Sequence, residues 1–299
     1  MENKVRFYQA SPAFETVMAI LIGLGVCLTR LSTAVSQISL VLAILTGFYL
    51  WWKNGKRLEL NPLAKKYMKV VGIFFAAALF SVIDVDNKAA TFRYFFGDWI
   101  WRFMVFILIV AFVRQKEYLL KILAGFLGVF SIDCFVACYQ FFILHWERGR
   151  GFHGDYLDLT AIICMVLAMS AIILLDSSFD KNIKKFALLG VISSIAGLFG
   201  CFGRGAFLVS ALVAPFYLFY YLRNSKKIAG IVLIVLLLIG STIVSSPKYV
   251  ERLSTTINTT TNRSNVDRIW TWKASFDMFK DYPINGVGLN NWNWYYKNK

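Results

Sequence analysis

The arginines of this chain are placed where they could have a chemical role. Arg204 lies between Gly203 and Gly205 at the junction of two apolar segments, and Arg268 lies near the start of a polar stretch at residues 264–292. A guanidinium group offers a planar fork of hydrogen-bond donors that matches phosphate oxygens. If both side chains face the same side of a membrane, they could share one phosphate-bearing substrate. Their joint role therefore depends on the elements that position them.

The polar stretch predicts a helix followed by a turn. Ser264 or Asn265 can serve as the N-cap, the helix must end before Pro283, and a tight turn then reaches Gly288. Arg268 falls in the first turn of this helix, where unpaired backbone amides favour an anion. Apolar side chains recur at helical spacing at Ile269, Trp272, Phe276 and Phe279.

Arg263 and Trp270 are further candidate substrate-binding residues in the same stretch. An interfacial amphipathic helix explains this pattern equally well, because Trp and Phe suit lipid headgroups while Arg and Lys face outward. Both interpretations remain open at this point.

A second arginine-bearing segment, H-W-E-R-G-R-G-F-H-G-D-Y, covers residues 145–156. Arg148 and Arg150 are its candidate substrate-binding residues, since charged, glycine-rich loops on a rigid scaffold often carry binding groups. His145 or His153 could serve as a base by geometry, although a histidine equally suits a solvated loop.

The composition is that of an integral membrane protein. Of the 299 residues, 58% are hydrophobic and 16% are charged, and the mean hydropathy is +0.59. A spanning helix needs about 20 apolar residues, so we predict an all-α, polytopic transmembrane bundle at residues 1–246 and an extracytoplasmic amphipathic segment at residues 247–299. About nine spans are expected, at 13–28, 34–52, 68–83, 99–113, 118–144, 157–175, 183–201, 206–222 and 228–246.

The basic residues predict the orientation of these spans. With the N-terminus in the cytoplasm, alternate loops hold seventeen basic residues inside and six outside. The loop at 84–98, the loop at 145–156, the turn at Arg204 and the segment after residue 246 then share the outer face. The formal net charge of +15 therefore mainly fixes orientation, and no nucleic-acid partner is expected.

Asp133 supports the competing hypotheses. An ionised carboxylate inside a span is costly, so it marks either a function or a buried partner, such as a neighbouring hydroxyl or Arg102 of the fourth span. A secondary transporter or flippase of a lipid-linked saccharide would use such a group for proton coupling. A non-enzymatic scaffold with an aromatic tail is a third class. The five cysteines all lie in apolar segments and are expected to pack there.

Three motifs resemble the O-antigen ligase and O-antigen polymerase superfamily of membrane glycosyltransferases. R-I-W followed by Y-P-I-N-G-V-G-L-N-N-W is similar to its extracytoplasmic signature, G-R-G-A-F at 203–207 is similar to a second arginine motif, and R-G-R-G-F-H-G is similar to its Arg/Gly-rich loop.

The resemblance implies transfer of a glycan from an undecaprenyl-diphosphate carrier to an acceptor hydroxyl on a glycolipid or saccharide. The expected location is the periplasmic face of a bacterial inner membrane, in lipopolysaccharide or other polysaccharide biosynthesis. Arg204 and Arg268 would be the catalytic residues that bind the diphosphate, with no metal or cofactor. Relatives continue through a histidine-bearing loop and further spans, so the sequence, which stops at Lys299, is expected to be truncated at its C-terminus.

Overall fold

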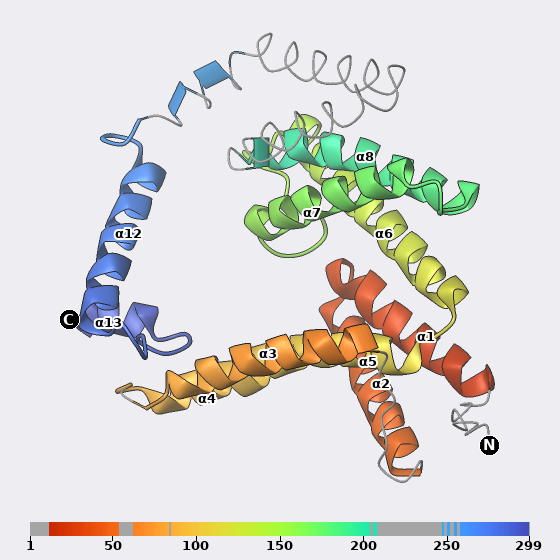
Figure 1. Ribbon diagram of the computed structural model, residues 1–299. Coiled ribbons are helices and arrows are strands. Elements are labelled where there is room, and N and C mark those ends of the chain that lie inside the picture. Colours follow the sequence, from red (N-terminus) through yellow and green to blue (C-terminus); the bar gives the residue numbers. More distant parts are fainter. Residues whose placement is uncertain are drawn as a thin grey trace. The chain divides into compact units, whose positions relative to one another are not determined.

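The computed structural model is built from helices. It describes residues 12–53, 62–83, 85–203 and 258–298, together with positions 206, 207, 247, 250, 251, 254 and 255. Throughout these residues the regular elements are helices joined by turns (Figure 1). The predicted all-α class is confirmed for the part of the chain that the structure describes.

Six described helical segments are long and apolar enough to cross a membrane: Ala13–Arg30, Thr33–Lys53, Lys88–Phe112, Lys116–Phe142, Tyr156–Leu175 and Lys181–Cys201. They correspond to six of the nine predicted spans. The predicted span at 68–83 falls on a helix, α3 (Pro62–Phe80), that begins earlier and carries three lysines near its start. Apart from residues 206 and 207, the predicted spans at 206–222 and 228–246 lie outside the described residues, as does the predicted boundary at residue 246.

The predicted loop at 84–98 is wrong. Helix α4 (Lys88–Tyr94) continues through a π-helical segment, η2 (Phe95–Trp99), into α5 (Ile100–Phe112). The Asn87 side chain caps this helix by accepting a hydrogen bond from the Ala90 amide at 3.2 Å. Within this continuous helix, Asp98 and Arg102 form an i,i+4 ion pair at 3.8 Å on the exposed helix surface.

The chain divides into two compact units, which are described separately. Unit 1 comprises residues 1–25, 37–119 and 260–299, and unit 2 comprises residues 26–36 and 120–259. Unit 1 holds most of α1 (Pro12–Cys27) and of α2 (Thr33–Lys53), together with α3 to α5, α12 (Arg263–Asp281) and α13 (Trp292–Asn298). Unit 2 holds the 3₁₀ turn η1 (Leu28–Arg30), most of α6 (Lys116–Phe142), α7 (Tyr156–Leu175) and α8 (Lys181–Cys201).

In unit 1, a carboxylate joins the start of α1 to the turn that follows α5. Glu15 accepts hydrogen bonds from the backbone amides of Arg114 at 2.9 Å and Gln115 at 2.8 Å. Next to it, the hydroxyls of Thr16 and Tyr118 lie 2.7 Å apart. These contacts bring two segments distant in the sequence to one end of the unit, which the charge pattern predicts to be cytoplasmic.

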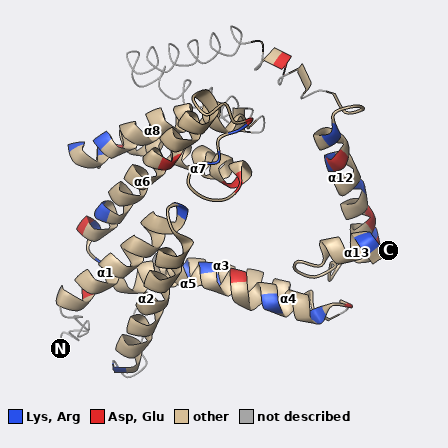
Figure 2. Ribbon diagram, turned by 180° about the vertical axis from the view of Figure 1, so that it is seen from behind, with Lys and Arg blue, Asp and Glu red and all other residues tan. Residues whose placement is uncertain are grey.

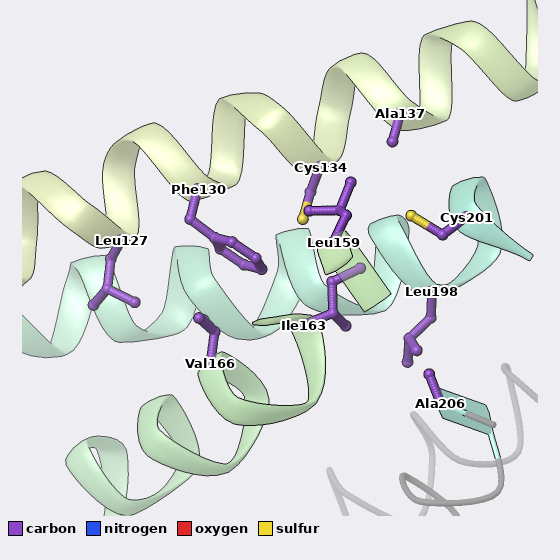
Figure 3. Close-up of a cluster of buried hydrophobic side chains, with 10 residues drawn as sticks. All are labelled: Leu127, Phe130, Cys134, Ala137, Leu159, Ile163, Val166, Leu198, Cys201 and Ala206. Carbon is purple, nitrogen blue, oxygen red and sulfur yellow. The ribbon is translucent and has the colours of Figure 1, made fainter. Parts of the chain in front are cut away.

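The core of unit 2 lies between α6, α7 and α8 (Figure 3). Its side chains are fully or almost fully buried, and they come from all three helices: Leu127, Phe130, Cys134, Ala137, Leu159, Ile163, Val166, Leu198 and Cys201, together with Ala206. Cys134 and Cys201 are free thiols in this core, which is the packing role that the sequence predicts. The three helices therefore form a rigid support for the loop between α6 and α7.

Candidate functional site

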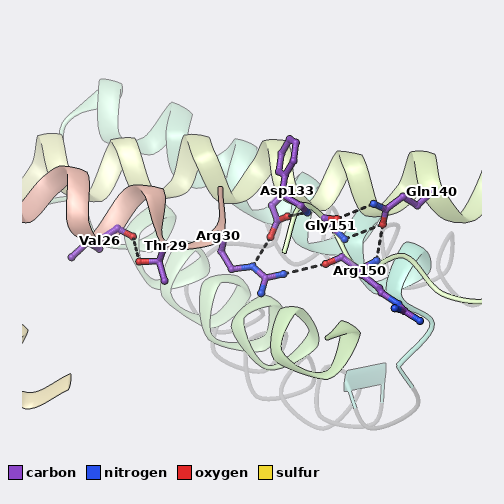
Figure 4. A network of polar contacts seen from close by, with 8 residues as sticks. Val26, Thr29, Arg30, Asp133, Gln140, Arg150 and Gly151 are labelled. Atoms are coloured by element: carbon purple, nitrogen blue, oxygen red, sulfur yellow. Dashed lines mark hydrogen bonds and ion pairs between the residues drawn. The ribbon is translucent and has the colours of Figure 1, made fainter. Parts of the chain in front are cut away.

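A buried ion pair organises one end of unit 2. The Arg30 Nε donates to Asp133 Oδ2 at 2.8 Å, and the Asp133 side chain is fully buried while that of Arg30 is 11% exposed. The second oxygen, Asp133 Oδ1, accepts from the Phe152 amide at 2.7 Å. Arg30 also donates through Nη2 to the Arg150 carbonyl at 3.1 Å (Figure 4). The pair thus joins η1, α6 and the loop between α6 and α7.

A glutamine completes the attachment of this loop to α6. Gln140 Oε1 accepts from the amides of Arg150 at 2.8 Å and Gly151 at 3.0 Å, and its Nε2 donates to the Gly151 carbonyl at 2.8 Å. Such a set of bonds satisfies several backbone groups at once, so the loop is held in one conformation. We call Arg30, Asp133, Gln140 and residues 149–152 the loop network.

Two glycines let the loop approach α6 this closely. A Cβ on Gly151, whose φ is +72°, would overlap the Asp133 carboxylate, and one on Gly149 would overlap the Ala137 carbonyl. The Gly149 amide donates to the Gly200 carbonyl near the end of α8 at 2.8 Å. The R-G-R-G sequence is therefore a requirement of packing, and the loop lies beside the helix that leads to Gly203.

The two arginines of the loop lie in different surroundings. The Arg148 guanidinium lies over the Tyr156 ring, 4.2 Å from its centroid, and is half-buried. Arg150 is exposed, and its side chain extends away from the loop network to which its backbone belongs (Figure 4). Both predicted substrate-binding residues are therefore placed by a fixed loop, and Arg150 is the more accessible of the two.

The predicted bridge between Asp133 and Arg102 is wrong. Arg102 pairs with Asp98, whereas Asp133 pairs with Arg30. Sequence reasoning missed this partner because it treated Arg30 only as a charge in a loop. A useful signal was present, since an acid inside a span needs a cation and Arg30 is the basic residue in the turn after the first span.

Helix α12 begins two residues earlier than a Ser264 N-cap allows and three earlier than an Asn265 N-cap allows, so the predicted cap at Ser264 or Asn265 is wrong. Its N-cap is Asn262 and its first residue is Arg263. Arg268 therefore lies in the second turn, outside the reach of the unpaired amides of the helix N-terminus, which belong to its first turn. Any anion affinity of Arg268 must come from its own guanidinium group. The predicted end before Pro283 is confirmed, because α12 ends at Asp281.

The predicted residues of α12 do not share one face. Two residues along a helix turn the side chain by roughly 200°, so Arg268 and Trp270 point to opposite sides. Arg263 lies on the Trp270 side and forms a loose pair with Asp267 at 4.0 Å. Arg268 is exposed and forms no ion pair with the residues that the structure describes.

The turn after α12 is anchored to the start of α4. Asn291 is fully buried, and its Nδ2 donates to Thr91 Oγ1 at 2.8 Å and to the Asn87 carbonyl at 3.2 Å. Thr91 Oγ1 in turn donates to the Leu289 carbonyl at 3.2 Å. Gly288, at φ +78°, leaves room for this contact, because a Cβ there would lie 2.8 Å from Thr91 Oγ1. The N-G-V-G-L-N-N-W motif thus has a structural role that the sequence alone did not indicate.

Aromatic packing joins α13 to α12. The rings of Tyr282 and Tyr295 lie 5.4 Å apart, and Trp292 Nε1 donates to Ser275 Oγ at 2.8 Å. Burial raises the pKa of the Tyr295 phenol above its ordinary value. We call residues 258–298 the tail. Its contacts with Asn87 and Thr91 agree with the predicted placement of the tail and of the segment after α3 on one side of the membrane.

Arg204 lies outside the described residues, so its distance from Arg268 is a matter for experiment. Among the described residues, no group of three or more His, Cys, Asp or Glu side chains could hold a metal ion.

Comparison with known proteins identifies the C-terminal part of the chain. The family model described as O-antigen ligase matches residues 189–299, which include the G-R-G-A-F motif and the whole tail. No curated protein and no solved structure matches the chain. At the level of the family, the match supports glycosyl transfer of the O-antigen ligase or polymerase type. On the strength of this match, residues 189–299 are similar to the O-antigen ligase family, and the match supports membership of the O-antigen ligase superfamily.

Proposed function

We propose that this protein transfers a glycan from an undecaprenyl-diphosphate carrier to an acceptor hydroxyl at the periplasmic face of the bacterial inner membrane. The observation that carries the proposal is the family match at residues 189–299, because it contains both Arg204 and Arg268. The six apolar helices agree with a substrate whose carrier is dissolved in the bilayer.

The reaction is a displacement at the anomeric carbon of the glycan. The acceptor oxygen forms the new glycosidic bond, the bond from the anomeric carbon to the diphosphate oxygen breaks, and the acceptor proton passes to a base. Negative charge grows on the departing lipid diphosphate. Cations held in place beside it stabilise this charge more in the transition state than in the ground state. Arg204 and Arg268 are proposed for this role.

The described residues give this proposal two supports. Arg268 is exposed, and therefore accessible to a ligand, on the face of α12 that also carries Trp272. Arg148 and Arg150 stand on a loop that is bonded to Gly200 near the end of α8, four residues before Arg204. We assign Arg148 and Arg150, with Arg263 and Trp270, to the saccharide portion of the donor or to the acceptor.

The alternative function, proton-coupled transport through Asp133, is not favoured. A coupling carboxylate must exchange protons with water during the transport cycle. Asp133 is instead fully buried, paired with Arg30, and bonded to the Phe152 amide. These contacts give Asp133 a structural role.

The test is glycan transfer in proteoliposomes, with the protein in the form that its gene encodes and a lipid-diphosphate-linked glycan as donor. Arg204→Gln and Arg268→Gln should each lower kcat about 10² to 10³-fold, the usual cost of removing one donor to a developing oxyanion. Arg268→Lys should recover part of this loss, because it keeps the charge but not the fork. Lys297→Gln removes one positive charge from the same tail and should leave the rate unchanged. Equal rates for Arg268→Gln and the unmodified protein would remove Arg268 from the site.

A further inference from the structure

Helix α12 presents one exposed apolar face. Ile269, Trp272, Phe276 and Phe279 succeed one another at intervals of three or four residues, which aligns them along one side of the helix. Trp272 is 70% exposed, Phe276 59% and Phe279 60%. We call these four residues the aromatic row. An exposed row of large apolar side chains marks a surface that contacts a membrane or another protein.

Positive side chains border the aromatic row on both sides. Arg268 lies four residues before Trp272, and residues four apart are neighbours on a helix. On the other border, Lys273 lies three residues before Phe276, with its Nζ 5.1 Å from the centroid of the Trp270 ring. The Lys280 Nζ lies 4.7 Å from the centroid of the Phe276 ring and 3.2 Å from Asp277 Oδ1. The cations are therefore placed where they can contact whatever covers the row.

Two acidic residues of α12 lie away from the aromatic row. Asp267 and Asp281 lie on the side of the helix that carries Trp270, opposite the aromatic row, and Asp277 is paired with Lys280 at 3.2 Å. Figure 2 shows blue and red segments in turn along α12, in the order of the sequence. An apolar face bordered by cations, with Asp267 and Asp281 on the far side, has the charge distribution that complements an anionic lipid surface.

The tail is also tied to the end of a membrane span. Asn291 is bonded to Thr91 in the first turn of the span Lys88–Phe112, and the next residue, Trp292, is bonded to Ser275 of α12. Through these two hydrogen bonds, α12 is connected to the first turn of a spanning helix, where that helix enters the bilayer. This linkage restricts how far α12 can move from the membrane surface.

We propose that the aromatic row of α12 is embedded in the headgroup region of the membrane, with Lys273 and Lys280 beside the phosphates of anionic phospholipids. Aromatic rings concentrate at this depth because they have an apolar body and a polar edge. Asp267 and Asp281 then face water, together with Trp270. This inference concerns the bulk lipid and does not depend on glycan transfer.

Trp272 and Trp270 form a matched pair for the test. They are the same residue type, they are 70% and 57% exposed, and they lie on opposite sides of one helix. The photo-crosslinking residue p-benzoylphenylalanine would replace each in turn in the whole protein, reconstituted without donor in vesicles of phosphatidylcholine with phosphatidylglycerol. Mass spectrometry would then identify the adducts. We expect phospholipid adducts several-fold more abundant at position 272 than at position 270.

A second arm tests the charges. Replacing phosphatidylglycerol by phosphatidylcholine should reduce the adducts at position 272. The double variant Lys273→Gln/Lys280→Gln should remove most of that difference, because each cation near an anionic surface changes the bound-to-free ratio by up to about fivefold. Asp281→Asn, on the far side of the helix, should have no such effect.

Three results would overturn the inference: equal phospholipid adducts at both positions, no adducts at either, or adducts at position 272 that join it to protein. Adducts to protein would show that a second copy or another part of this chain covers the row. None of these results would affect the proposed transfer reaction, which is measured separately by donor turnover.

Discussion

The loop network of unit 2 and the tail of unit 1 use their charged residues in opposite ways. In the loop network, the Arg30 guanidinium is almost completely buried and its hydrogen bonds go to the protein, to Asp133 and to the Arg150 carbonyl. In the tail, Arg268 is exposed, and buried amide and hydroxyl groups, Asn291 and Thr91, make the anchoring contact. The buried charge of Arg30 therefore holds a loop, whereas the exposed charge of Arg268 is accessible to a ligand.

This difference shows which cations can serve a phosphate-bearing substrate. A guanidinium that neutralises a buried carboxylate cannot leave it without exposing a costly unpaired charge. An exposed guanidinium on a helix that is anchored elsewhere can bind an anion with little loss of folding energy. Arg30 is therefore not available to the diphosphate, and Arg268 is the described cation that we assign to it.

The largest expected effect comes from breaking the buried ion pair. Arg30→Met or Asp133→Leu alone should lower the free energy of unfolding by about 3–5 kcal/mol, because each leaves one uncompensated buried charge. The double variant should recover most of this loss. Thermal unfolding in detergent measures the stability of the two single variants and of the double variant. Additive losses in the double variant would show that the two side chains do not depend on each other.

The second prediction concerns the close approach of the loop to α6. Gly151→Ala should be about 1–3 kcal/mol less stable than Gly154→Ala, since crowding a packed site has that typical cost. Both glycines have positive φ angles, but only at Gly151 would the added Cβ overlap Asp133. Gly154→Ala is thus the matched control for backbone strain. Equal losses of stability would contradict the packing of Gly151 against the carboxylate.

A smaller effect is expected at the anchor of the tail. Asn291→Ala removes its two side-chain hydrogen bonds and should destabilise the attachment by about 1 kcal/mol. Amide hydrogen exchange should accelerate in residues 282–298 and stay unchanged in α6 to α8. Asn290→Gly is the control, because the neighbouring Asn290 has a positive φ that glycine adopts readily. Unchanged exchange in Asn291→Ala would mean that the tail is held by other contacts.

The smallest expected effect on stability comes from the aromatic row. Trp272→Ala and Phe279→Ala should each change the unfolding free energy in detergent by less than about 0.5 kcal/mol, as substitutions of exposed residues usually do. A loss of several kcal/mol would show that the row packs against the protein, in contrast to the accessible surface described above.

The sequence predicts the helical class well, because a long apolar run in a lipid-soluble chain has few structural alternatives. It predicts neither the start of the span at Lys88 nor the partner of Asp133. The start of the span depends on a local helix cap, in which the Asn87 side chain accepts a hydrogen bond from the Ala90 amide. The partner of Asp133 depends on a contact between residues 103 positions apart in the chain. Neither hydrophobic periodicity nor the count of basic residues in each loop can predict such a contact.

The candidate site follows the same pattern. The R-G-R-G and N-G-V-G-L-N-N-W motifs were identified from residue types, and both fall at structured turns. Their physical roles are seen only in the three-dimensional structure. The first motif attaches a loop through Gln140, and the second attaches the tail through Asn291. Helix α12 begins two or three residues before the predicted start. This difference moves Arg268 out of the first turn, so helix-end electrostatics do not account for its proposed role.

The most direct test of the central claim is the dissociation constant of a polyprenyl diphosphate for the reconstituted protein, compared between the unmodified chain and Arg268→Gln at one ionic strength. Losing charge-assisted hydrogen bonds of about 1.5–3 kcal/mol should weaken binding roughly 10 to 100-fold. Lys297→Gln should bind as tightly as the unmodified chain. If the unmodified chain binds the diphosphate and Arg268→Gln binds it equally well, the accessible cation of the tail is not the diphosphate ligand and the central claim is wrong.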